Sequence, residues 1–281
     1  MIQSVGLRDR ISRATNTQTA ILAEDSFANE AEQRKIHDLM SRRTPPYFYA
    51  PKRGSWEQLK PPAKKVYEDK ERIYRKYRKL TSRELAAVCL AIFGEPESAK
   101  DRPAKITFEK VDGKDSEVYE RIFKSRNVAA QWLLPFELFR HANALFKREL
   151  SKDPDSDRAR IGEYGRYRMV HLAYGYLREL VGDKSSAKPP DFLSASVSED
   201  LLTRANDWAP NLLEVTLDAL VDGFSETQAR GDKGGLREFF REKKHQGLLN
   251  DRFQEELQKT ERVARRTGKS LSQFLGVGDG T

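Results

Sequence analysis

Apolar positions recur along most of the chain with the spacing of amphipathic helices. Between residues 66 and 80 they fall on one helical face, which predicts a helix there. Thr81 and Glu84 form a capping-box pair that predicts the start of the next helix, and Gly94 is placed to end it. Cys89 lies in the apolar stripe of this second helix, so we interpret it as a core residue and not as a nucleophile.

Other segments of the chain repeat the same helical pattern. We predict further helices at residues 27–40, 117–124, 127–150, 158–181, 198–208, 211–224, 236–244 and 248–266. Three glycines, Gly162, Gly165 and Gly175, lie inside one of them and are interpreted as points of close packing. Short strands are predicted at residues 47–49 and 105–110. The expected fold class is therefore mainly α with a few short strands near the N-terminus.

Prolines, glycines and polar runs suggest where this pattern divides. Pro189-Pro190 lies in the best candidate for a linker. We predict a basic segment with short strands at residues 1–80 and a helical domain at residues 81–182. A linker at 183–197 is predicted to lead to a C-terminal helical bundle at 198–275 and a disordered tail at 276–281.

Composition excludes several classes of protein. The chain has 281 residues, of which 33% are charged. It contains no apolar run of membrane-spanning length and no secretory signal, so we expect a cytoplasmic protein. One cysteine and four scattered histidines argue against disulfides and against a metal site. Phosphate-loop, dinucleotide-binding and nucleophile-elbow motifs are absent, so we predict no cofactor and no metal.

The positive charge of the chain is concentrated at one end. Residues 1–80 hold 18 Lys and Arg against 10 Asp and Glu, which accounts for the whole net charge of +8. Aromatic residues lie among these cations, and such a mixture can contact phosphates and stack on bases. A solvated helix face beside a tyrosine-rich core would produce the same pattern, and the sequence favours neither reading.

On the first reading, the predicted nucleic-acid-binding residues are cations that contact phosphates and aromatic rings that stack. The cations are Arg42, Arg43, Lys52, Arg53, Lys64 and Lys65, and the rings are Tyr47, Tyr49 and Trp56. Residues 12–19 add an unusual run of Thr, Asn and Gln, whose side chains could fix an irregular turn or read a base edge. Arg13, Asn16 and Gln18 are therefore also predicted to shape or read the site.

Two patterns could belong to a nuclease, and both are common by chance. Glu68-Asp69-Lys70 has the Glu-x-Lys spacing of a metal-dependent nuclease, but it lies in a highly charged segment predicted to be helical. Arg166 and His171 have the Arg-x4-His spacing of some helical ribonucleases. His171 lies in a tyrosine-rich segment, so we interpret it as a packed, hydrogen-bonded histidine, and we predict no catalytic residues.

An ordered set of short motifs resembles the AIPR family, the abortive-infection phage-resistance proteins. Residues 13–19 resemble the family's ATNxQT signature, and residues 27–33 resemble the helix that follows it. Residues 47–54 resemble its YYxRRxG element. Two later elements resemble residues 85–99 and 119–123, so that the resemblance covers about residues 8–125.

The resemblance implies a role in bacterial defence against phage. Family members are usually longer and some carry a nuclease domain, so we expect this chain to correspond to the C-terminal part of such a protein. The leading hypothesis is a non-catalytic module that binds nucleic acid, or a protein partner that supplies nuclease or ATPase activity, through residues 1–80. The alternatives are a nuclease effector, and an assembly subunit whose helices at residues 199–267 form an oligomeric or partner interface.

Overall fold

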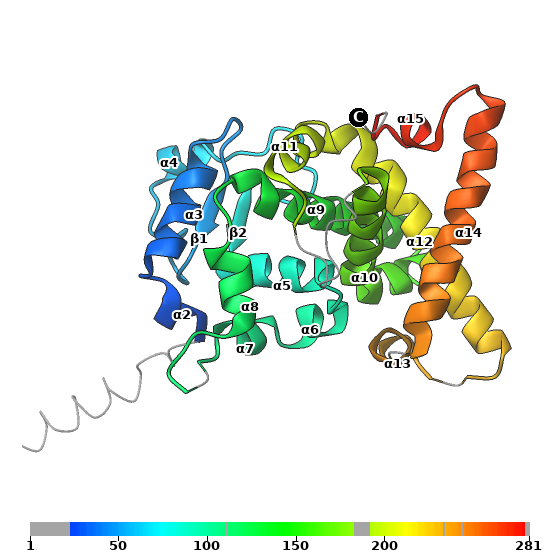
Figure 1. The fold of residues 1–281 in the computed structure, drawn as a ribbon, viewed down its shortest axis with the longest axis horizontal. Coiled ribbons are helices and arrows are strands. Elements are labelled where there is room, and N and C mark those ends of the chain that lie inside the picture. Colours follow the sequence, from blue (N-terminus) through cyan, green and yellow to red (C-terminus); the bar gives the residue numbers. More distant parts are fainter. Residues whose placement is uncertain (1–22, 111, 183–191, 233, 243, 279–281) are drawn as a thin grey trace, which may run out of the picture.

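The computed structural model describes residues 23–278 except 111, 183–191, 233 and 243. Figure 1 shows a mainly helical molecule with two short strands in its N-terminal part. This confirms the predicted fold class.

Four long helices form the centre and one side of the molecule (Figure 1). They are α9 (Ala129–Lys152), α10 (Asp157–Leu180), α12 (Ala205–Ala229) and α14 (Lys244–Arg266). Helix α9 packs against α10 and α12, and α14 packs on α12. Most of the first two turns of α9 are buried on every side, including Trp132 and Leu133, so this helix runs through the core.

The N-terminal part adds a short parallel β-ladder to the helical core. Its elements are α2 (Ala23–Phe27), α3 (Ala31–Ser41), β1 (Phe48–Ala50), α4 (Pro61–Lys65) and β2 (Lys79–Thr81). Phe48 pairs with Lys79 and Ala50 with Thr81. Both strands are only three residues long, so their position depends on the side chains that anchor them to the helices.

Shorter helices complete the structure (Figure 1). They are α5 (Ser82–Ile92), α6 (Pro96–Asp101), α7 (Pro103–Phe108), α8 (Glu117–Tyr119), the π-helical turn η1 (Glu120–Lys124), α11 (Ala195–Thr203), α13 (Leu236–Arg241) and α15 (Leu271–Leu275). One cluster of buried apolar residues extends from Phe27 to Val277. The core is therefore continuous across the predicted linker, while the predicted boundaries of independent folding units stay a prediction.

The predicted start and end of α5 are confirmed. Thr81 accepts a hydrogen bond from the backbone N–H of Glu84, and the Glu84 carboxylate accepts one from the N–H of Thr81. Gly94 follows the helix with a φ of +91°, a conformation that favours glycine. Cys89 is fully buried in α5, and burial raises the pKa of its thiol.

The helix predicted at residues 66–80 is wrong. This segment folds back on itself, with Glu68 bridged to Tyr77 and with Arg72 in the left-handed region at a φ of 50°. The fully buried carboxylate of Asp69 accepts the backbone N–H of Ile73 and pairs with two arginines. Tertiary ion pairing of Asp69 therefore prevails over the helical spacing of the apolar residues.

Three further local predictions need correction. Residues 105–110 are not a strand, because Pro103 occupies the first turn of α7 and starts a helix there. The helix predicted at residues 27–40 is divided between α2 and α3 by a break after Phe27. The boundary predicted between two helices at residues 208–211 is also misplaced. Helix α11 ends at Thr203 and α12 begins at Ala205, so the break lies at Arg204.

Of the three glycines of α10, Gly165 marks close packing as predicted, whereas Gly162 lies at an ordinary contact distance from its neighbour. A Cβ on Gly165 would lie 2.8 Å from Leu220 and 3.0 Å from Phe240, and one on Gly162 would lie 3.5 Å from Phe146. Gly175 differs, because a Cβ there would meet nothing within 4 Å. Gly165 therefore sets how closely α10 approaches α12 and α13.

We predict that alanine has opposite effects on stability at Gly165 and at Gly175, although both lie in α10. Gly175→Ala should stabilise the protein by about 0.5–1 kcal/mol, because alanine favours the helix and the space is free. Gly165→Ala should destabilise it by roughly 1 kcal/mol, because overpacking against buried side chains outweighs the same propensity gain. Urea unfolding of both variants measures the difference, and equal stabilisation by the two would contradict the packing described here.

Candidate nucleic-acid interface

Three of the predicted binding residues, Arg13, Asn16 and Gln18, lie outside the described residues. The structure places the other nine in three different environments. The aromatic rings face the interior, two of the arginines form ion pairs, and four cations lie on the surface without a carboxylate partner in the described part of the chain.

The aromatic residues are part of the core. Tyr49 is fully buried and donates its hydroxyl hydrogen bond to Gln33. Tyr47 is 6% exposed and donates to Glu137 at 2.8 Å. Burial raises the pKa of Tyr47, and the neighbouring Glu137 charge raises it further. These two rings are thus buried in the core and are not presented to a base in this structure.

Trp56 belongs to a second, smaller apolar cluster that supports α4. It packs edge-on against Phe48, with ring centroids 5.1 Å apart, and against Tyr77 at 5.0 Å. The ammonium groups of Lys64 and Lys79 lie 5.5 and 5.4 Å from the centroid of its ring. The side chain is 8% exposed, so its role here is to hold cations in place through cation–π contacts.

Two of the predicted cations are neutralised by carboxylates. Arg43 donates two hydrogen bonds to Glu199 of α11, at 2.6 and 2.7 Å. Arg53 pairs with Asp25 at 3.2 Å. The Arg43 pair connects the N-terminal part to the helix that follows the predicted linker, so this arginine acts as a structural contact.

The remaining predicted cations keep their charge available. Arg42, Lys52 and Lys65 are exposed and Lys64 is partly exposed, and none of the four pairs with a carboxylate of the described residues. Lys60, which precedes the first residue of α4, is also exposed and pairs with no carboxylate of the described residues. We call Lys52, Lys60, Lys64 and Lys65 the α4 lysine patch (Figure 1 shows α4 at one edge of the molecule).

The cations of residues 70–79 contribute less free charge than the sequence suggests. Arg75 pairs with Glu84 at 2.7 Å, Arg78 with Asp69 at 2.9 Å, and Lys79 with Glu57 at 3.5 Å. Much of the basic excess of residues 70–79 is thus used internally.

Sequence reasoning missed a buried ionic network that joins residues 47–78 to α9. Arg140 is 3% exposed and pairs with both Glu137, at 2.6 Å, and Asp69. Burial alone would lower the pKa of Arg140, but the charge and hydrogen bond of Glu137, together with the neighbouring Tyr47 and Asp69, outweigh burial and the pKa is raised. Arg140 is therefore a permanent cation inside the protein.

This network lines a cavity of about 220 Å³ between residues 43–78, α9 and the start of α12. The three guanidiniums that line it, of Arg43, Arg78 and Arg140, each already contact a carboxylate. Asn206 at its edge donates to Glu71 at 2.5 Å. The cavity is therefore polar but internally balanced, and its charges position backbone segments.

Neither nuclease pattern forms a catalytic arrangement in the described structure. His171 contacts the backbone oxygen of Ala91 at 3.1 Å, and Arg166 hydrogen-bonds to Asn143 and lies over Phe146. In the Glu68-Asp69-Lys70 pattern, Asp69 is fully buried and paired with arginines, whereas Lys70 is exposed. His171 is thus the packed histidine of the simpler reading.

Asp232, Glu242 and His245 place possible metal-ligand atoms within 4.8 Å of one another. Lys244 already bridges the two carboxylates, at 3.0 Å from Asp232 and 2.7 Å from Glu242. His245 is held by the backbone oxygen of Phe239 at 3.0 Å. Because an ammonium group occupies this position, the cluster is explained as an ion-pair network.

Comparison with known proteins identifies the family of this chain. The model of the family described as AIPR protein matches residues 2–216, so the chain belongs to the AIPR family. The match extends well beyond residues 8–125, on which the resemblance rested. Membership indicates a role in abortive infection and phage resistance. No curated protein and no solved structure matches, and no described helix is long and apolar enough to cross a membrane.

We predict that Arg140→Met loses about 3–5 kcal/mol of unfolding free energy, because Asp69 and Glu137 keep their buried negative charge without this partner. Arg230→Met is a matched control, since Arg230 is 70% exposed and pairs with Glu226 on the surface. The control should change stability by less than about 1 kcal/mol. Urea denaturation measures both, and similar small losses would show that the network contributes little.

His171 should make stability depend on pH. Burial, followed by the charge of Arg168, lowers the pKa of His171 from 6.5 to about 4. Between these values the unfolded chain binds a proton that the folded chain excludes, so stability falls as the pH falls. The loss from this group by pH 4 is up to about 3 kcal/mol. His171→Gln should show a shallower decline in urea melts between pH 7 and pH 4; an unchanged slope would contradict this.

Proposed function

We propose that this AIPR protein serves phage defence as a non-catalytic module that binds nucleic acid through the α4 lysine patch. The observation that supports the proposal is the electrostatic state of four lysines that lie in α4 or shortly before it in the chain. They are Lys52, Lys60, Lys64 and Lys65, and no carboxylate of the described residues neutralises them. Unpaired surface cations attract the phosphate backbone and release its counterions.

The side chains that pack beneath the patch favour the same function. Lys64 lies over Trp56, which is fixed between Phe48 and Tyr77. Helix α4 begins with two prolines, Pro61 and Pro62, which restrict its backbone. Cations on such a support lose less conformational freedom when they bind, so each phosphate contact costs less entropy.

A separate observation supports the proposal that the module is non-catalytic. Both nuclease patterns of the sequence are engaged in internal contacts within the described structure, His171 with Ala91 and Asp69 with Arg140. A module of this kind would deliver or hold a nucleic acid while another protein acts on it.

Binding of labelled single-stranded DNA, duplex DNA and single-stranded RNA, measured by anisotropy over a range of salt concentrations, tests the proposal. If all four lysines contact a single strand, the slope of log K against log salt should be about −3. Glutamate at all four positions should abolish binding at physiological salt, because it replaces attraction with repulsion along the same surface.

A matched control reverses four exposed cations at the end of α14 and just after it, namely Arg262, Arg265, Arg266 and Lys269. This variant has the same change in net charge, so any effect of overall charge alone would appear in it equally. Binding should survive in the α14 variant. No binding by the native chain at low salt, or equal loss in the two variants, would reject the proposal.

A further inference from the structure

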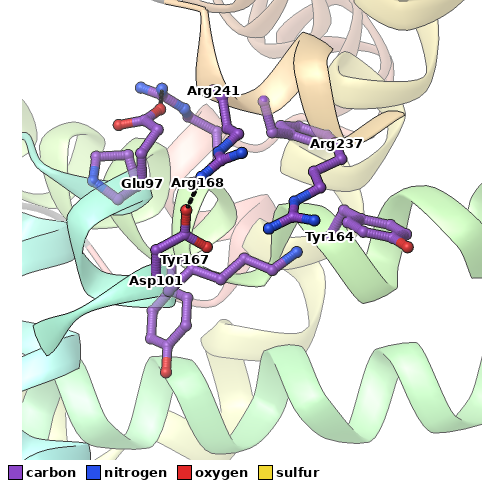
Figure 2. Close-up of a pocket in the computed structure, with 10 residues that line it drawn as sticks. Glu97, Asp101, Tyr164, Tyr167, Arg168, Arg237 and Arg241 are labelled. Atoms are coloured by element: carbon purple, nitrogen blue, oxygen red, sulfur yellow. Dashed lines mark hydrogen bonds and ion pairs between the residues drawn. The ribbon is translucent and has the colours of Figure 1, made fainter. Parts of the chain in front are cut away.

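A second cationic site lies far from the α4 lysine patch in sequence, in a cleft between α6, α10 and α13 (Figure 2). Four basic side chains line it: Lys100, Arg168, Arg237 and Arg241. Two of them have carboxylate partners within the cleft. Arg168 pairs with Glu97, and Arg241 pairs with Asp101 at 2.7 Å.

The other two cations are not compensated. Lys100 and Arg237 are exposed at the cleft and pair with no carboxylate in the described part of the chain. Figure 2 shows the Arg237 guanidinium directed toward the cleft beside Tyr164 and facing Asp101 and Arg241. The ammonium group of Lys100 lies 3.9 Å from the centroid of the Tyr164 ring. Both carboxylates of the cleft are already used, so two positive charges remain.

The cations repel one another in this arrangement. Lys100 is accessible to solvent, but the surrounding protein displaces part of its hydration, which lowers its pKa, and the charges of Arg166 and Arg237 lower the pKa further. Asp101 and Glu163 act in the opposite direction without reversing the shift. The folded protein therefore holds like charges together that a bound anion would stabilise.

A buried hydrogen-bond donor supplies independent evidence. Arg168 is 4% exposed, yet its Nε finds no hydrogen-bond partner among the described residues. A buried donor without an acceptor costs free energy comparable to a lost hydrogen bond, and such groups are rare in native structures. Arg168 is one of the residues that line the cleft, and we infer that a water or an acceptor held at its inner end satisfies this group.

We propose that the α6–α10–α13 cleft binds a terminal phosphate group. Two uncompensated cations match a terminal phosphate, which carries about −1.5 to −2 charge at neutral pH, better than a phosphodiester, which carries one negative charge. The enclosed part of the cleft measures about 20 Å³, roughly the room for one water. The phosphate therefore lies at the mouth, between Lys100 and Arg237, with a water or one oxygen reaching inward.

Calorimetric titration at constant ionic strength tests this assignment with inorganic phosphate, adenosine monophosphate, cyclic adenosine monophosphate and adenosine as probes. The full chain should bind the first two, bind the cyclic diester at least about 10-fold more weakly, and ignore adenosine. Constant ionic strength is required because exposed charges are screened by salt. Binding of phosphate without the monophosphate identifies free phosphate as the ligand, and binding of both identifies a phosphate monoester.

The decisive variant is Lys100→Gln with Arg237→Gln, which removes both uncompensated charges from exposed positions. It should weaken phosphate binding about 10-fold or more. Lys105→Gln with Arg262→Gln removes the same charge from exposed positions elsewhere and should bind as the native chain does. Thermal melts of both variants confirm that each is folded.

Three results would overturn the assignment: no binding of either phosphate or the monophosphate by the native chain, equal binding by the Lys100 and Arg237 variant, or equal affinity for the cyclic diester. The inference does not depend on the nucleic-acid proposal. The variant with glutamate in the α4 lysine patch should retain phosphate binding, so the failure of one proposal leaves the other measurable.

Discussion

The position of the N-terminal part depends on one buried cation. Arg140 projects from α9, pairs with Glu137 on the same helix and reaches Asp69 in the folded-back segment before β2. Tyr47 donates to the same Glu137 from the segment that leads into β1. Two three-residue strands cannot hold their place by backbone pairing alone, so this network determines where β1, β2 and the attached α4 lie.

The network also separates two uses of positive charge in the first 80 residues. Some cations, such as Arg43 and Arg78, are bound to carboxylates and keep segments together. Others, in the α4 lysine patch, remain free for an external anion. Net charge along a sequence counts both kinds equally, which is why the basic excess of residues 1–80 exaggerates the charged surface that the fold presents.

Much of the fold could be predicted from sequence because helical spacing and capping are local. The Thr81–Glu84 box, the core position of Cys89 and the course of α10 all follow from neighbours in the chain. Residues 66–80 could not be predicted, since Asp69 takes its partner from 71 residues away. The cations of the candidate site could be listed from the sequence. Which of them are neutralised could not be predicted, because the carboxylates that pair with them are distant in the chain.

The placement of the three tryptophans has an experimental consequence. Trp132 and Trp208 are fully buried in the helical core, whereas Trp56 lies under Lys64 and Lys79 beside α4. Indole emission responds to nearby charge, so an anion that draws those ammonium groups away should alter the fluorescence of Trp56 and leave that of the other two unchanged. A chain that retains Trp56 with phenylalanine at positions 132 and 208 would provide an intrinsic optical reporter of occupancy at this surface.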